Sequence, residues 1–241
     1  FIAGSNGMVG SSVLRKFKSL KFKNIITRSR KELNLENSAG VYNFFKKQKP
    51  EYVIIASAKV GGILANTSYP VEFLQSNLKI QNNLIENSFR FGVKKLIFLG
   101  SSCIYPLSKK KLSEKDLLSG KVEPTNESYA MAKISGMKLC EAYKKQYGCD
   151  FRSIIPCNLY GYGDNYHLNN SHVLPALIRK FWEAKQNSSK SVNYPDYAHK
   201  LSKKINKKQN IGILVCGSGM GMSMSANKHK NIRAALCYSV K

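Results

Sequence analysis

Short apolar runs alternate with helix-like patterns over the first three quarters of the chain. Strand-length apolar runs stand at residues 1–3, 24–27, 52–58, 95–100 and 151–157. Helical patterns follow them through about residue 19 and near residues 38–48, 71–91, 129–147 and 172–186. Alternation of this kind is typical of a parallel sheet with helices on both faces. The pattern therefore predicts an α/β fold with a doubly wound parallel sheet.

The pattern changes after about Ala184. Residues 185–192 are polar, lack apolar periodicity and predict a junction. Beyond it we expect a helix near residues 197–207, a strand at 211–216, a glycine turn, a further helix and a strand at 232–237. The sequence thus predicts one domain over residues 1–184 and a short α/β fragment over residues 193–241.

The chain is strongly basic. Its 241 residues include 39 basic and 14 acidic side chains, a net charge of +25. Such a balance is found in nucleic-acid-binding proteins, but here the basic residues are scattered and no nucleic-acid-binding motif accompanies them. We therefore expect Lys-rich solvated helix faces, no nucleic-acid partner, and a positive field that attracts an anionic small substrate.

The cysteines and the apolar runs limit the class of protein. The six cysteines show neither CxxC pairs nor metal-ligand spacing, so we expect free thiols, no metal and a cytoplasmic location. No apolar run approaches the ~20 residues of a membrane span, so we expect no membrane partner. The chain begins without Met, inside a predicted strand. We interpret this start as a chain that lacks its first few residues, not as a signal peptide.

The segment GSNGMVG follows the first strand and opens a helix. Glycine permits a tight turn and lets backbone amides approach a pyrophosphate, and the helix N-terminus adds partial positive charge. Glycine turns are common, but the strand–turn–helix context favours a Rossmann-like dinucleotide site. The residues expected to border the cofactor here are Gly4, Ser5, Asn6, Gly7, Met8, Val9 and Gly10.

The end of the second strand indicates which dinucleotide binds. NAD-binding units usually place Asp or Glu there, to bond the ribose hydroxyls. This chain places Arg28 and Arg30 there instead. Guanidinium groups suit a 2′-phosphate, so the sequence predicts NADP(H), although two solvated arginines would give the same pattern.

Tyr129 and Lys133 are four residues apart at the start of a predicted helix, so their side chains share one face. A lysine beside the phenol is expected to lower the pKa of the phenol, which lets Tyr129 exchange a proton near neutral pH. A YxxxK pair often occurs by chance. Its significance here comes from Ser101 at the end of the preceding strand, where a hydroxyl can bond a substrate carbonyl beside Tyr129.

A glycine turn, a strand-end serine and YxxxK, in that order, resemble the extended short-chain dehydrogenase/reductase family. Within it, the segments AKVGGILAN, FLGSSCIYP, EPTNESYAMAK, PCNLYG and NSHVLPALIRKF resemble the GDP-L-fucose synthase group, over residues 1 to about 184. The resemblance implies epimerisation of a GDP-linked 4-keto-6-deoxymannose at C3 and C5. Reduction of C4 by NADPH then gives GDP-fucose. It also implies a nucleotide-sugar partner and allows a homodimer.

The same resemblance assigns roles to residues that spacing alone leaves open. It implies that Cys103 and His172 are the base and acid of epimerisation; without it, a packing role for Cys103 and a surface role for His172 are favoured. Asn6 stands where some relatives carry Arg, and Lys180 where relatives carry a phosphate-binding Arg. Further cofactor contacts are implied for Leu99, Gly100, Ser102, Pro156, Asn158 and Leu159, and substrate contacts for Val173 and Lys180.

The tail resembles a different family. VNYPDYAHKL, GILVCGSGMGMSMSANK and NIRAALC are similar to the B type of ribose-5-phosphate isomerase. The resemblance implies that Cys216 is the base of a C1–C2 proton transfer, with Ser218 where relatives usually carry Thr. The opening strand of that family and its distal phosphate-binding arginines are missing. The chain thus looks like two truncated enzymes joined near residues 185–190.

Three hypotheses of function remain open at this stage. The first is an NADP-dependent epimerase–reductase. For this truncated chain we expect NADPH binding to be retained better than catalysis on the GDP-sugar or on ribose-5-phosphate. The second is an aldose–ketose isomerase fragment. The third is a non-catalytic remnant that binds nucleotides or, through its net charge of +25, nucleic acid.

Overall fold

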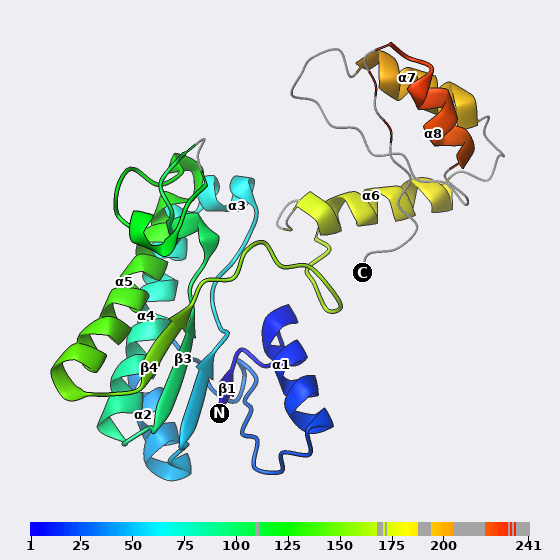
Figure 1. The fold of residues 1–241 in the computed structure, drawn as a ribbon. Helices are drawn as coiled ribbons and strands as arrows, with labels where there is room; N and C mark the ends of the chain where they lie inside the picture. Colours follow the sequence, from blue (N-terminus) through cyan, green and yellow to red (C-terminus); the bar gives the residue numbers. More distant parts are fainter. Residues whose placement is uncertain are drawn as a thin grey trace. The chain divides into compact units, whose positions relative to one another are not determined.

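The computed structural model describes residues 1–108, 111–167, 171, 173–187, 194–204, 220–230, 232 and 234 (Figure 1). The chain forms two compact units, Phe1–Ile178 and Arg179–Lys241.

A parallel sheet forms the centre of the first unit. Its strands are β1 (Ile2–Ala3), β2 (Tyr52–Ile55), β3 (Lys95–Leu99) and β4 (Phe151–Ile154), in the order β1-β2-β3-β4. Every pair is parallel, with Ile2 beside Ile54, Ile54 beside Ile97, and Ile97 beside Arg152. The sheet confirms the predicted α/β class.

The strand predicted at residues 24–27 is wrong in extent. Only a single bridge joins Thr27 to Ile2, on the edge of β1 away from β2, with Ile2 N–H donating to the Ile26 carbonyl at 3.0 Å. The physical reason is the brevity of β1. The glycine turn begins directly after Ala3, so the neighbouring segment has almost no strand to pair with.

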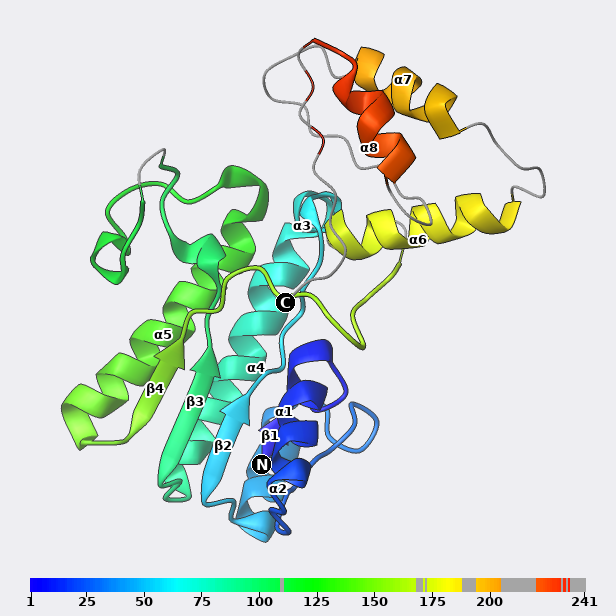
Figure 2. The ribbon, with the colours of Figure 1, turned by 45° about the vertical axis from the view of Figure 1, so that its right-hand side comes forward.

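Helices cover both faces of the sheet. α2 (Ser38–Gln48), α4 (Pro70–Arg90) and α5 (Glu127–Tyr147) form a layer on one face, in which α4 contacts both α2 and α5. α1 (Met8–Ser19) lies on the opposite face (Figures 1 and 2). This arrangement is the doubly wound topology that the alternating pattern predicts.

The core of this unit lies between the sheet and the three-helix layer. Phe45 of α2, Leu84 and Ile85 of α4, and Leu96 and Phe98 of β3 are each at most 1% exposed. The alternation in β3 is typical of a strand whose one face meets a helix layer, with Leu96 and Phe98 buried and their neighbours only half-buried. Each such side chain contributes about 1.5–3 kcal/mol through burial.

Two buried polar side chains of α4 fix the loops around the carboxyl edge of the sheet. Asn77 Oδ1 accepts from Lys59 N–H at 2.8 Å, and Asn77 Nδ2 donates to the Lys59 carbonyl at 3.0 Å. Gln81 Nε2 donates to the Ala132 carbonyl of α5 at 2.8 Å. Because these amides are satisfied, their burial holds the segment after β2 and the start of α5 in place.

Shorter helices lie near the carboxyl edge. They are α3 (Ile63–Ser68) and the 3₁₀ turns η1 (Ser102–Ile104), η2 (Glu114–Asp116) and η3 (Pro124–Asn126). α6 (Val173–Asn187) crosses the boundary between the two units. Among the described residues, no helix has the length and apolarity needed to span a bilayer.

The second unit contains α7 (Tyr194–Lys204) and α8 (Met220–Asn227), which contact each other. Ala198 and Ala226 are buried, and His199 Nδ1 lies 2.8 Å from His229 Nε2. The predicted strand at 211–216 lies outside the described residues, as does most of the one at 232–237.

Candidate active site

The glycine turn after β1 is held in a shape that two of its glycines require. Gly4 has φ +83°, and a Cβ there would lie 2.6 Å from Ser57 N. A Cβ on Gly10 would lie 2.1 Å from the Gly4 carbonyl oxygen. A side chain at Gly4 would therefore clash with the segment that follows β2, and one at Gly10 would push α1 away from the glycine turn.

The N-terminus of α1 offers an anion site. Its N-cap is Gly7, which supplies no side-chain cap, and its first turn carries no acidic residue. The first backbone N–H groups of the helix therefore keep their partial positive charge for a ligand. Asn6, Gly7, Met8 and Val9 line the adjoining cavity, whereas Ser5 and Gly10 are buried beneath it.

This cavity has a volume of about 830 Å³ and follows the carboxyl ends of the strands. In doubly wound sheets, ligands bind at this edge. It runs from the glycine turn to the residues after β3 and β4. Of the residues predicted from the sequence, those that line it are Gly4, Asn6, Gly7, Met8, Val9, Arg28, Arg30, Leu99, Gly100, Ser101, Cys103, Tyr129, Lys133, Pro156, Asn158 and Leu159.

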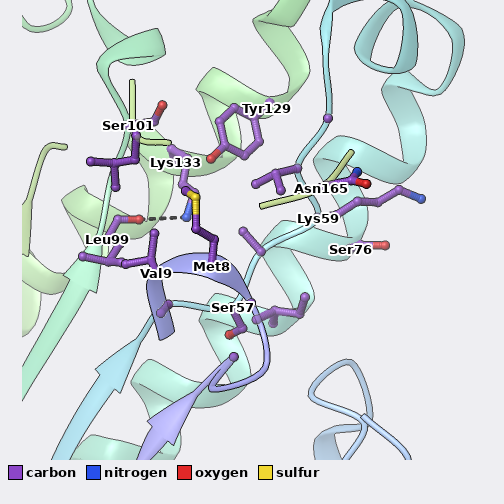
Figure 3. Close-up of a pocket in the computed structure, with 18 of the residues that line it drawn as sticks. Met8, Val9, Ser57, Lys59, Ser76, Leu99, Ser101, Tyr129, Lys133 and Asn165 are labelled. Carbon is purple, nitrogen blue, oxygen red and sulfur yellow. Dashed lines mark hydrogen bonds between the residues drawn. The ribbon is translucent and has the colours of Figure 1, made fainter. Parts of the chain in front are cut away.

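Ser101, Tyr129 and Lys133 gather at one end of the cavity (Figure 3). Ser101 precedes η1, and its Oγ accepts from Cys103 N–H at 3.3 Å. Tyr129 stands in the first turn of α5, where Phe73 packs edge-on against it with ring centroids 6.5 Å apart. Lys133 follows one turn later on the same face.

The structure contradicts the expected effect of Lys133 on Tyr129. Lys133 Nζ donates to the Leu99 carbonyl at 2.8 Å and lies 5.8 Å from the centre of the Tyr129 ring. Burial raises the pKa of Tyr129 to about 12, and negative charge on Cys103 adds to this, while a hydrogen bond with Ser101 opposes it. The phenol of Tyr129 is therefore protonated at neutral pH.

Burial acts on Lys133 in the opposite direction, since it disfavours the charged form of either group. It lowers the pKa of Lys133 to about 8. The residue is 3% exposed, and its Nζ also lies 4.8 Å from the centre of the Phe98 ring. The carbonyl of Leu99 and the aromatic faces are the groups that hold this cation in the core.

Arg28 and Arg30 reach the cavity differently. Arg28 Nη1 donates to the Thr27 carbonyl at 2.7 Å, and its guanidinium lies 5.6 Å from the centre of the Phe44 ring. Arg30 is 83% exposed and forms an ion pair with Glu36 at 3.2 Å. Because Glu36 also lines the cavity, it offsets part of the positive charge that Arg30 brings.

The other predicted site residues are not among the described residues that line this cavity. Ser102 begins η1 and does not line it, although its N–H donates to the Pro156 carbonyl at 3.2 Å. Val173 is the first residue of α6, and Lys180 is an exposed residue of the second unit. His172, Cys216 and Ser218 lie outside the described residues.

Other lining residues were not singled out from the sequence. Those with polar or charged side chains include Glu36, Ser57, Lys59, Asn66, Ser76, Asn126, Asp164, Asn165 and Ser171. Ser57 and Lys59 could have been found by position, because they stand at the carboxyl end of the apolar run at 52–58. The others stand in loops and helices whose orientation depends on tertiary packing.

Comparison with known families agrees with this architecture. The NAD dependent epimerase/dehydratase family matches residues 1–197, and the chain belongs to this family. A Ribose/Galactose Isomerase family matches residues 166–241, which confirms the resemblance predicted for the tail. The two matches overlap across residues 166–197.

Particular relatives confirm the predicted resemblance to GDP-L-fucose synthases. The chain is 52% identical to the putative GDP-L-fucose synthase 2 of Arabidopsis thaliana over 193 residues, 80% of this chain and 59% of the relative. It is 50% identical to GDP-L-fucose synthase of Escherichia coli over 193 residues, 60% of that protein. The chain therefore spans about three fifths of the length of these relatives.

Solved structures show the same fold. A GDP-L-fucose synthetase from Naegleria fowleri bound to NADP aligns with TM-score 0.72 and 32% identity, over 80% of this chain and 64% of that chain. A GDP-mannoheptose C4 reductase from Campylobacter jejuni with NADP bound aligns with TM-score 0.69 and 41% identity, over 75% of this chain and 55% of that chain.

Proposed function

We propose that this chain is an NADP(H)-dependent epimerase–reductase that acts on a GDP-linked 4-keto-6-deoxymannose and forms GDP-L-fucose. The observation that carries the proposal is one cavity lined by the glycine turn together with Ser101, Cys103, Tyr129 and Lys133. The similarity to GDP-L-fucose synthases supports the choice of substrate.

The residues present fit a dinucleotide. The turn at Gly4 and Gly10 leaves no room for side chains, and the uncapped start of α1 supplies amide donors for a pyrophosphate. Arg28 and Arg30 line the same cavity and suit a 2′-phosphate. When bound, NADPH would supply the hydride that reduces C4.

The side chains of this chain would handle the protons. Ser101 and the phenol of Tyr129 hold the keto oxygen and stabilise the negative charge that develops on it when a neighbouring carbon loses its proton. Cys103 removes that proton, and His172 returns one to the opposite face of the ring. In the reduction, Tyr129 donates its proton to the oxygen on C4.

Cofactor preference tests the first part of this proposal. We expect NADPH to bind more tightly than NADH, and Arg28→Ala to weaken NADPH binding by about 1.5–3 kcal/mol, as for a charge-assisted bond. Fluorescence titration of both nucleotides measures this. Equal affinities of the wild type for the two nucleotides would contradict it.

Product formation tests the second part. The wild-type chain should convert the keto sugar to GDP-L-fucose, and Tyr129→Phe should lose the reduction while it still binds NADPH. Tyr160→Phe is the matched control, because Tyr160 is 56% exposed and lies outside the cavity lining.

We further propose that the protein is a cytoplasmic homodimer with no nucleic-acid or membrane partner. Light scattering tests the homodimer, and salt-dependent DNA titration tests the absence of nucleic-acid binding.

A second candidate function rests on the isomerase match of residues 166–241. In this proposal Cys216 moves a proton between C1 and C2 of a sugar phosphate, and Ser218 stands two positions later in the sequence. An assay of ribose-5-phosphate isomerisation by the wild type and Cys216→Ser tests it. Isomerisation that Cys216→Ser abolishes would favour this candidate, and no turnover by the wild type would exclude it.

A further inference from the structure

Buried polar atoms without partners concentrate in the cavity. In the described part of the chain, six buried side-chain atoms have no hydrogen-bond partner: Ser57 Oγ, Asn66 Oδ1, Asn87 Oδ1, Asn126 Oδ1, Ser153 Oγ and Ser171 Oγ. Four of these residues line the cavity, namely Ser57, Asn66, Asn126 and Ser171. An unsatisfied buried polar group costs about 1–3 kcal/mol, so this concentration points to a ligand that satisfies them.

Asn66 is held with its acceptor unused. Its Nδ2 donates to the carbonyls of Gly61 at 2.9 Å and Gly62 at 3.1 Å. These two bonds fix the orientation of the amide, and they leave Oδ1 on the opposite side without a donor. The residue is only 7% exposed, so bulk water does not replace the missing partner.

Asn126 stands at the N-cap of α5 but does not cap it. An N-cap asparagine ordinarily accepts from an N–H of the first helical turn. Here no side-chain cap bond forms, and Oδ1 is buried and unpaired. The carboxamide therefore serves neither the helix nor any other described group, three residues before Tyr129 in the chain.

Ser171 completes a cluster with these two asparagines. Its carbonyl oxygen packs against Gly62, where an added Cβ would lie 2.7 Å from it, next to the carbonyls that hold Asn66. α3, which carries Asn66, contacts η3, which ends at Asn126. Ser57 is separate, because its backbone packs against Gly4 in the glycine turn.

We propose that Asn66, Asn126 and Ser171 form a hydroxyl-binding subsite that recognises the sugar ring of the substrate; this inference rests on the proposed function. A carboxamide oxygen only accepts hydrogen bonds, so two such atoms require two donors on the ligand. Phosphate, carboxylate and keto oxygens cannot supply them. The hydroxyl groups on C2 and C3 of the 4-keto-6-deoxy sugar can, and Ser171 can donate to or accept from either.

The subsite makes a prediction about affinity. A ligand with sugar hydroxyls should bind more tightly than the same nucleotide without the sugar, by about 5- to 150-fold for 1–3 kcal/mol of satisfied polar groups. We use GDP-mannose and GDP as the probes, because both are stable and they differ only in the hexose. The measured quantity is the ratio of their dissociation constants.

Asn126 offers the cleanest variants, because its side chain makes no capping bond that the fold would lose. Asn126→Ala should bring the ratio close to one, and Asn126→Asp, which keeps an acceptor oxygen, should restore part of it. Asn66→Ala should also lower the ratio. Asn87→Ala is the matched control: its Oδ1 is equally unpaired, but it lies on α4 outside the cavity lining.

Calorimetric titration of the wild-type chain and these variants with both probes tests the hydroxyl-binding subsite. NADPH is titrated in parallel. A wild-type ratio that Asn126→Ala removes and Asn87→Ala keeps supports the subsite. Wild-type NADPH binding without preference for GDP-mannose, or an unchanged ratio in Asn126→Ala, overturns the subsite alone. Failure of the wild type to bind NADPH and both probes overturns the proposed function as well.

Discussion

Lys133 carries a positive charge in the core, 3% exposed, with the Leu99 carbonyl as its hydrogen-bond partner. Burial lowers its pKa to about 8, so in the free protein it loses its proton as the pH rises past about 8. NADPH is an anion. If it binds beside Lys133, its affinity should therefore fall above that pH, by at most about tenfold per pH unit.

Titration of NADPH by fluorescence at pH 7, 8 and 9 measures this pH dependence. The matched variant is Lys133→Met, whose side chain at this position is uncharged at every pH tested. It should bind NADPH weakly, and its affinity for NADPH should not change near pH 8. A wild-type affinity that stays constant over this range would show that the Lys133 charge does not contribute to cofactor binding.

Two roles are open for Cys103, which lies inside η1. It is either the base in epimerisation or a packing residue. If it is the base, Cys103→Ser should slow deuterium wash-in at C3 and C5 of the keto sugar by about 10²–10⁴-fold, the usual contribution of general base catalysis. Mass spectrometry of the sugar in D₂O measures this exchange.

Cys149→Ser is the control for that experiment, because Cys149 packs at the edge of the core and does not line the cavity. Exchange at the wild-type rate in Cys103→Ser would exclude the thiol as base and leave the packing role.

At the scale of elements, the sequence predicted the helices well, because helix formation depends mainly on residues that are close together in the chain. The extents of α2 and α5 follow closely from apolar periodicity, and α5 ends at Gly148, which has φ +71°. The sequence predicted a strand at 24–27 and could not show that it forms only a single bridge, because a strand depends on its neighbour and β1 ends after two residues. Pairing partners are a tertiary property.

The site shows the same division. The YxxxK spacing places Tyr129 and Lys133 on one face of α5, as predicted. It does not show that the Leu99 carbonyl, 34 residues away in sequence, holds the ammonium. Likewise, an asparagine before a helix predicts a cap, and only the packed structure shows that Asn126 Oδ1 stays unpaired. The chemical roles of the site residues remain predictions.

The end of α1 provides an element-scale prediction. Lys21 has φ +61°, in the left-handed region, while its N–H donates to the Lys18 carbonyl and Phe22 N–H donates to the Phe17 carbonyl. The Phe17 and Phe22 rings pack 5.2 Å apart. This is the Schellman arrangement, which usually has glycine at that position. Lys21→Gly should therefore stabilise the first unit, by about 0.5–1 kcal/mol.

Lys16→Gly is the matched control, since it places glycine at an exposed position inside the same helix. It should destabilise the first unit by about 1 kcal/mol. Urea unfolding followed by circular dichroism gives both changes. Stabilisation by both variants, or by neither, would contradict the conformational argument.

At the scale of the whole molecule, the candidate cofactor site belongs to one unit. All the described residues that line the cavity lie within residues 1–178, whereas α7 and α8 belong to the second unit. A ligand stabilises the unit that it binds. At 100 times the dissociation constant, this stabilisation is about 2.7 kcal/mol, which slows exchange through unfolding about 100-fold.

NADPH should therefore slow hydrogen exchange in α4, α5 and β3 while leaving exchange in α7 and α8 unchanged. Peptide-level mass spectrometry with and without NADPH measures this, and NADH at the same concentration is the control that should protect less. Equal slowing in both units would show that they unfold as one cooperative body. Slowing in neither unit would contradict a cofactor site at the glycine turn. The contrast between α5 and α8 thus tests the site and the independence of the two units in one measurement.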